Sequence, residues 1–276
     1  MAETTGIEWT DATVNFWWGC TKVGPGCDHC YAETWSARFG ENLWGLGAPR
    51  RKIKGAVALI QRLNGSSFFY ENDRRMRVFI QSMSDLFDTE VPLEWFAEAW
   101  AKIVQCDRLD IQIVTKRISV VEKRLAAIGV TTWPKHAGLL VTVCNQAEAD
   151  RDIPRLLALK ARLGIPWVGV SAEPLLGPID FTSVAYQDGQ IDALRGDLWG
   201  GSGTGAFASG LDWIIVGGES GAGARPMEDA WAESIVEQCT AAGTAVFVKQ
   251  MGGPVKDRMR PIPKHLMVRQ FPEVRR

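Results

Sequence analysis

The chain has 276 residues, of which 46% are hydrophobic and 23% are charged, and this composition excludes a disordered chain and a collagen-like repeat. The formal net charge is −1, so any nucleic-acid surface must be a local patch. No apolar segment approaches the roughly 18 residues of a membrane helix, and the polar N-terminus lacks the pattern of a leader peptide. We therefore expect a cytoplasmic protein without membrane contact, and we expect it to be a monomer.

Short apolar segments alternate with amphipathic ones along the chain. The segments expected to form strands are 13–19, 77–82, 110–116, 139–145, 165–172, 211–217 and 244–250. The segments with apolar residues at every third or fourth position, expected to form helices, are 93–104, 119–128, 147–163 and 230–241. This alternation predicts a single α/β domain over residues 1–276, a partial or near-complete parallel (β/α) TIM-like barrel.

Each predicted strand ends in polar or reactive residues. In chain order these are Cys20; Ser82, Ser84 and Asp85; Lys116 and Arg117; Cys144 and Asn145; Ser171 and Glu173; Glu219 and Ser220; and Lys249 and Gln250. In a parallel barrel the carboxyl ends of the strands share one rim, where active sites are built. We therefore predict a site at this rim, although any one of these residues is as well explained by the point where a strand meets solvent.

Two segments interrupt the alternation. Residues 176–210 are rich in glycine and serine and are expected to form an inserted surface loop, while residues 251–276 form a basic C-terminal tail. This tail and the clusters at 49–54 and 73–77 are candidate phosphate contacts, and residues 196–210 are a weak candidate for a base-extruding wedge. A solvated face explains such charge clusters equally well.

The strongest signal is a C-x6-C-x2-C array formed by Cys20, Cys27 and Cys30. A zinc site needs a fourth ligand, and the nearby His29 lies between two cysteines at a spacing too tight for most tetrahedral sites. A [4Fe-4S] cluster held by three cysteines leaves one iron open for a cofactor or substrate. The turn at residues 24–26 also lets backbone N–H groups approach cluster sulfides. An iron-sulfur cluster is therefore the favoured interpretation over structural zinc.

The array resembles that of the radical S-adenosylmethionine (radical SAM) superfamily, although the usual spacing there is C-x3-C-x2-C. The longer first gap is similar to that of a phage-type three-Cys-motif family related to spore photoproduct lyase. The segments that carry this resemblance, between about residues 7 and 253, are IEWTDAT, GCTKVGPGCDHCYAE, SMSDLFD, TKR, SAEPLLGPID, LDWIIVGGESGAGARPM and VKQMGG.

The resemblance implies an enzyme with a [4Fe-4S] cluster and S-adenosyl-L-methionine as cofactors. An electron from a donor such as flavodoxin or ferredoxin would cleave the cofactor to methionine and a 5′-deoxyadenosyl radical. The favoured function is a radical SAM lyase that repairs a UV-induced thymine dimer in DNA, with damaged DNA as its partner. The alternatives are a radical SAM enzyme acting on another nucleoside, an RNA or a small metabolite, and a non-catalytic zinc-stabilised nucleic-acid-binding protein.

The resemblance also suggests which residues contact S-adenosylmethionine. Asp85, with Ser82 and Ser84, takes the place of a turn that faces the methionyl ammonium group. Lys116 and Arg117 are suited to the methionyl carboxylate, although a solvated helix start explains them as well. Glu173 and Glu219 are candidates for the ribose hydroxyls or the substrate, with structural pairing to Lys116 or Lys249 as the alternative. Asn145 completes the predicted cofactor-binding set.

Two residues are candidates for hydrogen-atom transfer. Cys144 is expected at the rim, where a thiol would donate a hydrogen atom to a substrate radical, as spore photoproduct lyase requires; a buried structural cysteine is the equal alternative. Tyr31 follows Cys30 and is a candidate relay, although packing beside the cluster is the commoner use of such a tyrosine. Cys106 and Cys239 fall late in amphipathic segments and are expected to be core residues.

Overall fold

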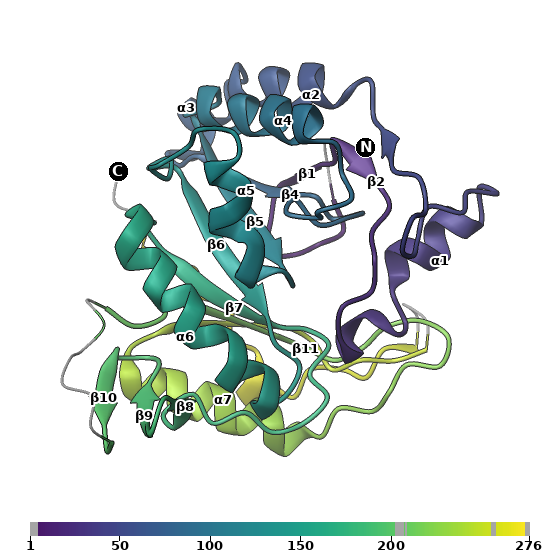
Figure 1. Ribbon diagram of the computed structural model, residues 1–276. Coiled ribbons are helices and arrows are strands. Elements are labelled where there is room, and N and C mark those ends of the chain that lie inside the picture. The colour runs from purple at the N-terminus through teal and green to yellow at the C-terminus, as the bar shows by residue number, and fades with distance from the viewer. Residues whose placement is uncertain (1–4, 202–206, 208, 255–257, 274–276) are drawn as a thin grey trace. The chain divides into compact units, whose positions relative to one another are not determined.

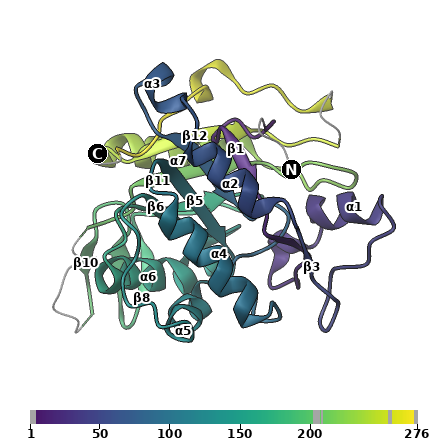
Figure 2. The ribbon, with the colours of Figure 1, turned by 90° about the horizontal axis from the view of Figure 1, so that it is seen from above.

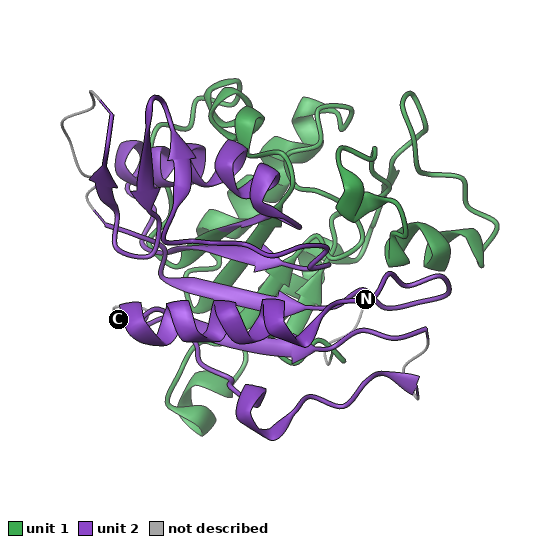
Figure 3. Cartoon of the chain, turned by 90° about the horizontal axis from the view of Figure 1, so that it is seen from below, with its two compact units in different colours: residues 1–139 green, residues 140–276 purple. Residues whose placement is uncertain are grey.

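The computed structural model describes residues 5–201, 207, 209–254 and 258–273. The chain divides into two compact units, residues 1–139 and residues 140–276, which Figure 3 colours separately. The expectation of a single domain over the whole chain stays a prediction.

A seven-stranded sheet runs through the strand order β1-β4-β5-β6-β7-β11-β12, and the boundary between the two units falls within β6. The strands are β1 (Ala12–Val14), β4 (Met76–Ile80), β5 (Leu109–Thr115), β6 (Ala137–Thr142), β7 (Val168–Ala172), β11 (Trp213–Gly217) and β12 (Ala245–Gln250). The pairings β1·β4, β4·β5, β7·β11 and β11·β12 are all parallel. This confirms the predicted fold class, an α/β protein built as a partial TIM-like barrel.

Each of the seven predicted segments overlaps a strand of this sheet, but the first segment is interrupted. After β1, the backbone N–H of Phe16 donates to Gln81 Oε1 at 2.6 Å, so a side chain replaces the backbone partner of a neighbouring strand. The next two residues form β2 (Trp17–Trp18), which pairs antiparallel with β3 (Arg51–Lys52) in a separate two-stranded sheet. The chain therefore leaves the main sheet just before the cysteine array.

Unit 1 contains five α-helices among its described residues. They are α1 (Tyr31–Ala37), α2 (Ala56–Asn64), α3 (Phe68–Asn72), α4 (Leu93–Gln105) and α5 (Val121–Ala126). Helices α2 and α4 lie side by side and bury Leu59, Ile60, Phe96 and Trp100 (Figure 1, Figure 2). The periodicity predicted α4 and α5, and the structure adds α1, α2 and α3. The apolar faces of α2 and α4 form part of the core of unit 1.

Unit 2 contains the long helices α6 (Gln146–Leu163) and α7 (Asp229–Ala242), both at the predicted positions. The glycine- and serine-rich segment contains a three-stranded antiparallel sheet, with β8 (Val184–Tyr186), β9 (Gly189–Asp192) and β10 (Asp197–Trp199). Its residues Phe181, Val184 and Ile191 are fully buried, so much of this segment is packed structure. Part of the candidate wedge at 196–210, residues 202–206 and 208, lies outside the described residues.

The C-terminal tail packs along β12 in its described part. Val248 N donates to the Val268 carbonyl at 2.9 Å, Gln270 N donates to the Val246 carbonyl at 2.9 Å, and Leu266 is buried. Residues 255–257 and 274–276, which include part of the predicted basic charge, lie outside the described residues. In the part of the chain that the structure describes, no helix is long and apolar enough to cross a membrane.

Candidate functional site

The three cysteines of the array lie on one loop that is anchored at both ends. Cys20 forms a parallel bridge with Trp44, and Cys30 is the N-cap residue of α1. Cys27 ends a short 3-10 helix, Pro25–Cys27, between them. Gly19 begins the loop with a φ of +104°, and a Cβ at this position would lie 2.5 Å from the Leu43 carbonyl oxygen, so only glycine fits here. The backbone therefore fixes the positions of both ends of the loop, at Gly19–Cys20 and at Cys30.

All three cysteines are partly exposed, and none is in a disulfide. Burial raises the pKa of the Cys20 thiol to about 12, helped by the nearby carboxylate of Asp85. Among the described residues, no group of three or more His, Cys, Asp or Glu side chains is arranged to hold a metal ion, and this includes the cysteines. Metal binding would therefore require the three sulfur atoms to approach one another.

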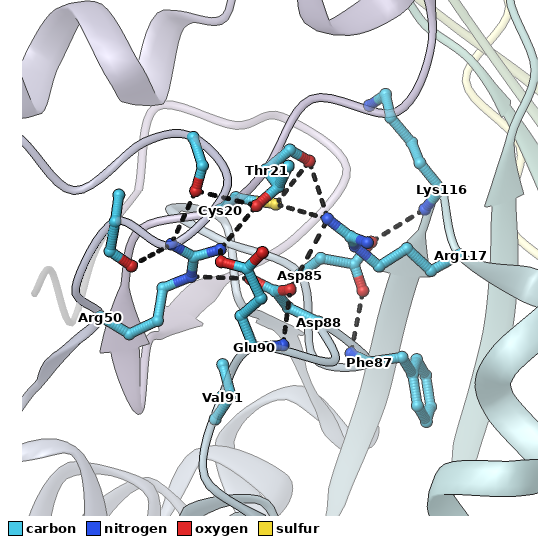
Figure 4. A network of polar contacts seen from close by, with 12 residues as sticks. Cys20, Thr21, Arg50, Asp85, Phe87, Asp88, Glu90, Val91, Lys116 and Arg117 are labelled. Carbon is cyan, nitrogen blue, oxygen red and sulfur yellow. Dashed lines mark hydrogen bonds and ion pairs between the residues drawn. The ribbon is translucent and has the colours of Figure 1, made fainter.

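Arg117, from the end of β5, reaches the Cys20 sulfur. Its Nη2 lies 3.8 Å from Cys20 Sγ, donates to the Thr21 carbonyl at 2.7 Å and forms an ion pair with Asp88 Oδ1 at 3.6 Å (Figure 4). The Nε of Arg117 is buried and has no hydrogen-bond partner. A buried donor without a partner is costly, so this site in unit 1 offers one unused N–H group beside a cysteine sulfur.

Arg50 completes a buried ionic network below the cysteine loop. Its Nε lies 2.8 Å from Asp88 Oδ2, and its Nη2 lies 3.0 Å from Glu90 Oε2 and 2.7 Å from Thr21 Oγ1. The side chains of Arg50 and Asp88 are only 2% and 0% exposed. Arg50 belongs to the basic cluster at 49–54 that sequence analysis considered for phosphate binding, and its burial excludes that role. Sequence reasoning also missed Asp88, although it lies in the SMSDLFD segment.

Asp85 ties the loop after β4 to the end of β5. Its carboxylate accepts hydrogen bonds from Phe87 N at 2.9 Å, Thr115 Oγ1 at 2.9 Å and Lys116 N at 3.0 Å. Burial raises the pKa of Asp85, while Arg117 and these hydrogen bonds act in the opposite direction. Both carboxylate oxygens thus have partners within the protein and hold the backbone at Lys116 and Arg117. Its predicted contact with a methionyl ammonium group stays a prediction.

Tyr31, Ser82 and Ser84 join the cysteine loop to the end of β4. The Tyr31 hydroxyl donates to the Ser82 carbonyl, and Ser84 Oγ donates to the Trp17 carbonyl at 3.0 Å. Asn15 holds this turn by donating its amide to Ser82 Oγ at 3.0 Å and accepting from Met83 N at 2.7 Å. Unit 1 therefore brings together Cys20, Tyr31, Ser82, Ser84, Asp85, Lys116 and Arg117, all predicted site residues.

Within unit 2, Cys144 and Asn145 form the start of α6. Asn145 Oδ1 accepts from Glu148 N at 3.0 Å, and Glu148 Oε2 accepts from Cys144 N at 2.8 Å. Asn145 thus caps α6 with its side chain, which explains this residue without a ligand. Cys144 is 0% exposed. Its role as a hydrogen-atom donor and the cofactor role of Asn145 stay predictions.

Glu173 and Glu219 both form ion pairs inside unit 2. Glu173 pairs with Lys249, one of the structural alternatives that the sequence suggested. Glu219 Oε2 accepts from Arg225 Nε at 3.0 Å and Glu219 Oε1 accepts from Arg225 Nη2 at 2.5 Å, a bidentate pairing with a residue that sequence analysis did not consider. Arg225 and Glu219 are six residues apart in the segment GGESGAGARPM. The sequence of this segment indicates no helix or strand, so it could not predict that the two side chains pair. These two pairs fix the polar ends of β7, β11 and β12.

Other residues of the basic clusters also have acidic partners. Arg51 pairs with Glu41, Lys52 pairs with Glu98, and Arg74 lies 2.7 Å from Asp11. In the tail, Arg260 pairs with Asp229. These contacts favour the structural interpretation of the charge clusters over a continuous phosphate-binding patch.

Comparison with known proteins assigns the chain to a family. A family model described as "Protein of unknown function (DUF5131)" matches residues 4–274. None of the curated proteins matches the chain. Among solved structures, the chain is similar to a spore photoproduct lyase mutant with bound AdoMet and dinucleoside spore photoproduct, at 16% identity and a TM-score of 0.38. It is also similar to a second mutant of that lyase, at 17% identity and a TM-score of 0.39. These matches cover 59% and 60% of this chain, and 45% and 46% of the lyase chains, less than half of their length.

Proposed function

We propose that this chain, which belongs to the DUF5131 family of proteins of unknown function, is a radical SAM enzyme that holds a [4Fe-4S] cluster on Cys20, Cys27 and Cys30. The observation that carries the proposal is the anchored loop with three thiols, together with the buried Arg117 that reaches Cys20 Sγ and has an unused N–H donor. The resemblance of the cysteine array to the radical SAM superfamily supports the same conclusion.

The chemistry of these donors fits an iron-sulfur cluster. Thiolates are the ligands of such clusters, and three of them leave one iron open to a cofactor. The unpartnered Nε of Arg117 is suited to an anionic acceptor, such as a cluster sulfide or a cofactor carboxylate. Zinc would need a fourth ligand, and the nearby His29 lies between two cysteines at a spacing too tight for most tetrahedral sites.

The chain's own residues would bind and orient the cofactor. When reduced, a cluster of this kind supplies the electron that cleaves S-adenosylmethionine and generates a 5′-deoxyadenosyl radical. Arg117 and Lys116 provide cationic groups for the methionyl carboxylate, and Asp85 fixes their backbone through its bond from Lys116 N. The Tyr31 hydroxyl donates to the Ser82 carbonyl, which ties the start of α1 to the turn after β4 beside the cysteine loop.

The substrate that we propose is a UV-induced thymine dimer in DNA, with Cys144 as the hydrogen-atom donor and a flavodoxin or ferredoxin as the source of electrons. The sequence segments shared with the three-Cys-motif family support this substrate. The ion pairs of the basic clusters leave less uncompensated positive charge for a DNA duplex than the sequence suggested. Another nucleoside, an RNA or a small metabolite is therefore the competing outcome of the substrate assay.

The cofactor part of the proposal is tested by metal content and by S-adenosylmethionine cleavage. Protein purified without oxygen is expected to be brown, to contain iron and sulfide, and to release 5′-deoxyadenosine in the presence of dithionite. Cys20→Ala, Cys27→Ala and Cys30→Ala should each lose iron, whereas Cys239→Ala, a fully buried cysteine outside the loop, should retain it. Colourless protein loaded with zinc would contradict the proposal.

The substrate part is tested with UV-irradiated DNA and with a dinucleotide photoproduct. Restored thymines, measured by chromatography, support repair of the dimer. Inert lesions in a sample that still cleaves S-adenosylmethionine would show that the enzyme acts on another substrate.

A further inference from the structure

The Cys20 sulfur lies in a charged, buried environment that its own loop does not provide. Arg117 lies two residues after the end of β5, and its Nη2 is 3.8 Å from Cys20 Sγ. The side chain of Arg117 is only 12% exposed, so water screens its charge weakly. A cation in this position is the partner that a buried sulfur needs if it carries negative charge.

A second arginine holds the first one through a shared carboxylate. Asp88 Oδ1 pairs with Arg117 Nη2 at 3.6 Å, and Asp88 Oδ2 pairs with Arg50 Nε at 2.8 Å. We call Arg50, Asp88 and Arg117 the arginine brace. Both arginines also bond to Thr21, the residue after Cys20: Arg117 to its carbonyl and Arg50 to its hydroxyl, each at 2.7 Å (Figure 4). The brace therefore fixes the cysteine backbone and the guanidinium with respect to each other.

Resting on the proposed function, we infer that Arg117 raises the reduction potential of the cluster on Cys20, and that Asp88 and Arg50 are positioning residues for its guanidinium. Reduction adds one negative charge to the cluster, and no bond is made or broken in this step; the electron comes from the flavodoxin- or ferredoxin-class donor, or from dithionite in vitro. A cation and N–H donor at a ligating sulfur stabilises the more negative state. The reduced state is therefore favoured by the intact brace.

Midpoint potentials of the anaerobically reconstituted full chain test this inference. Potentials are measured by redox titration followed by electron paramagnetic resonance, with iron and sulfide content determined for each sample. Arg117→Gln should lower the reduced-to-oxidised ratio at a fixed applied potential about tenfold, which corresponds to about 59 mV for one electron. Arg117→Lys keeps the positive charge but lacks the planar guanidinium group, so the midpoint potential should decrease less than in Arg117→Gln.

Two further variants separate positioning from general loss of charge. Asp88→Asn loosens the hold on Arg117 but also removes a carboxylate near Cys20, which by itself would raise the potential, so a potential below that of wild type would show that the positioning of Arg117 outweighs the lost negative charge. Arg74→Gln removes a cation that pairs with Asp11 and is the matched control, which should keep the wild-type potential. If Arg117→Gln fails to retain iron, Arg117→Lys and Asp88→Asn still report the shift.

The outcomes of the two proposals differ. Wild-type protein that takes up no iron and sulfide would overturn the proposed function and, with it, this inference. If the wild type carries the cluster, equal potentials in wild type and Arg117→Gln would overturn the inference and leave the proposed function intact. Where Arg117→Gln loses iron, equal potentials in wild type and Arg117→Lys would do the same.

Discussion

Asp110 lies directly across from Arg77 in the parallel pairing of β4 and β5, yet Asp110 Oδ1 is buried and has no hydrogen-bond partner. Burial raises the pKa of Asp110 to about 6, although Arg77 and Arg75 act in the opposite direction. The carboxyl group of Asp110 therefore stays protonated to a higher pH in the folded chain than in the unfolded chain, where the pKa of an aspartate is near 3.9.

This difference predicts a pH-dependent effect of Asp110→Asn. Between about pH 4 and pH 6 the folded state holds a proton that the unfolded state has released, so the contribution of Asp110 to stability falls as the pH rises. The free energy of unfolding of the variant, relative to wild type, should therefore increase by up to about 3 kcal/mol across this range. Urea unfolding of both proteins at several pH values, followed by circular dichroism, measures the difference. A constant or decreasing difference would contradict the raised pKa.

The arginine brace predicts a large effect of Asp88→Ala on stability. The substitution leaves Arg50 and Arg117 without their shared carboxylate, and breaking a buried ion pair in this way typically costs about 3–5 kcal/mol. Glu98→Ala is the control, because Glu98 and Lys52 are both more than 40% exposed and such pairs contribute about 1 kcal/mol or less. Chemical unfolding of the two variants should separate them clearly, and equal losses would show that the brace is not a significant source of stability.

Much of the sheet follows from local pattern, because strands covered on both faces tend to be continuously apolar, as most of the seven predicted segments are, and each of the seven overlaps a strand of the main sheet. The features that the sequence did not predict depend on contacts between residues that are far apart in the chain. Phe16 leaves the main sheet through a bond to Gln81, which is 65 residues away in sequence. Arg50 lies in a basic segment of the kind usually found at a protein surface. Its burial depends on the contact with Asp88, which is 38 residues away in sequence and could not be predicted from the local pattern. The unit 1 site was predicted as a set of strand ends, but not the bonds that connect its members.

The capping arrangement at α6 predicts that Asn145→Ala lowers the stability of the protein by about 1 kcal/mol. Asn145→Ser keeps a side-chain acceptor for Glu148 N and should recover most of this loss. Thermal and urea unfolding measure the stability, and equilibrium dialysis of S-adenosylmethionine measures the predicted cofactor contact separately. Lower S-adenosylmethionine affinity in a variant of normal stability would assign Asn145 to the cofactor site, whereas a stable Asn145→Ala would contradict the capping role.

The ends of β11 and β12 approach each other so closely that Gly218 has no room for a side chain. A Cβ at Gly218 would lie 2.6 Å from the carbonyl carbon and oxygen of Met251, and Gly218 N donates to the Gln250 carbonyl at 2.9 Å. Gly218→Ala should therefore cost about 1–3 kcal/mol of unfolding free energy, because backbone atoms must move. Gly177→Ala is the control, since its Cβ would meet Asn145 Cβ at an ordinary 3.7 Å. A similar stability of the two variants would contradict the close approach.

Cys144→Ala tests whether this buried thiol takes part in the proposed reaction. If Cys144 donates a hydrogen atom to the substrate radical, the variant should still cleave S-adenosylmethionine but should give aberrant products or cleavage uncoupled from repair. Cys239→Ala is the matched control, because both thiols are 0% exposed and both substitutions remove the same atom from the interior of unit 2. The two variants are compared by the ratio of restored thymine to 5′-deoxyadenosine in anaerobic reactions with the dinucleotide photoproduct. Wild-type ratios in both would assign Cys144 to the core, whereas a lower ratio in Cys144→Ala alone would assign it to the reaction.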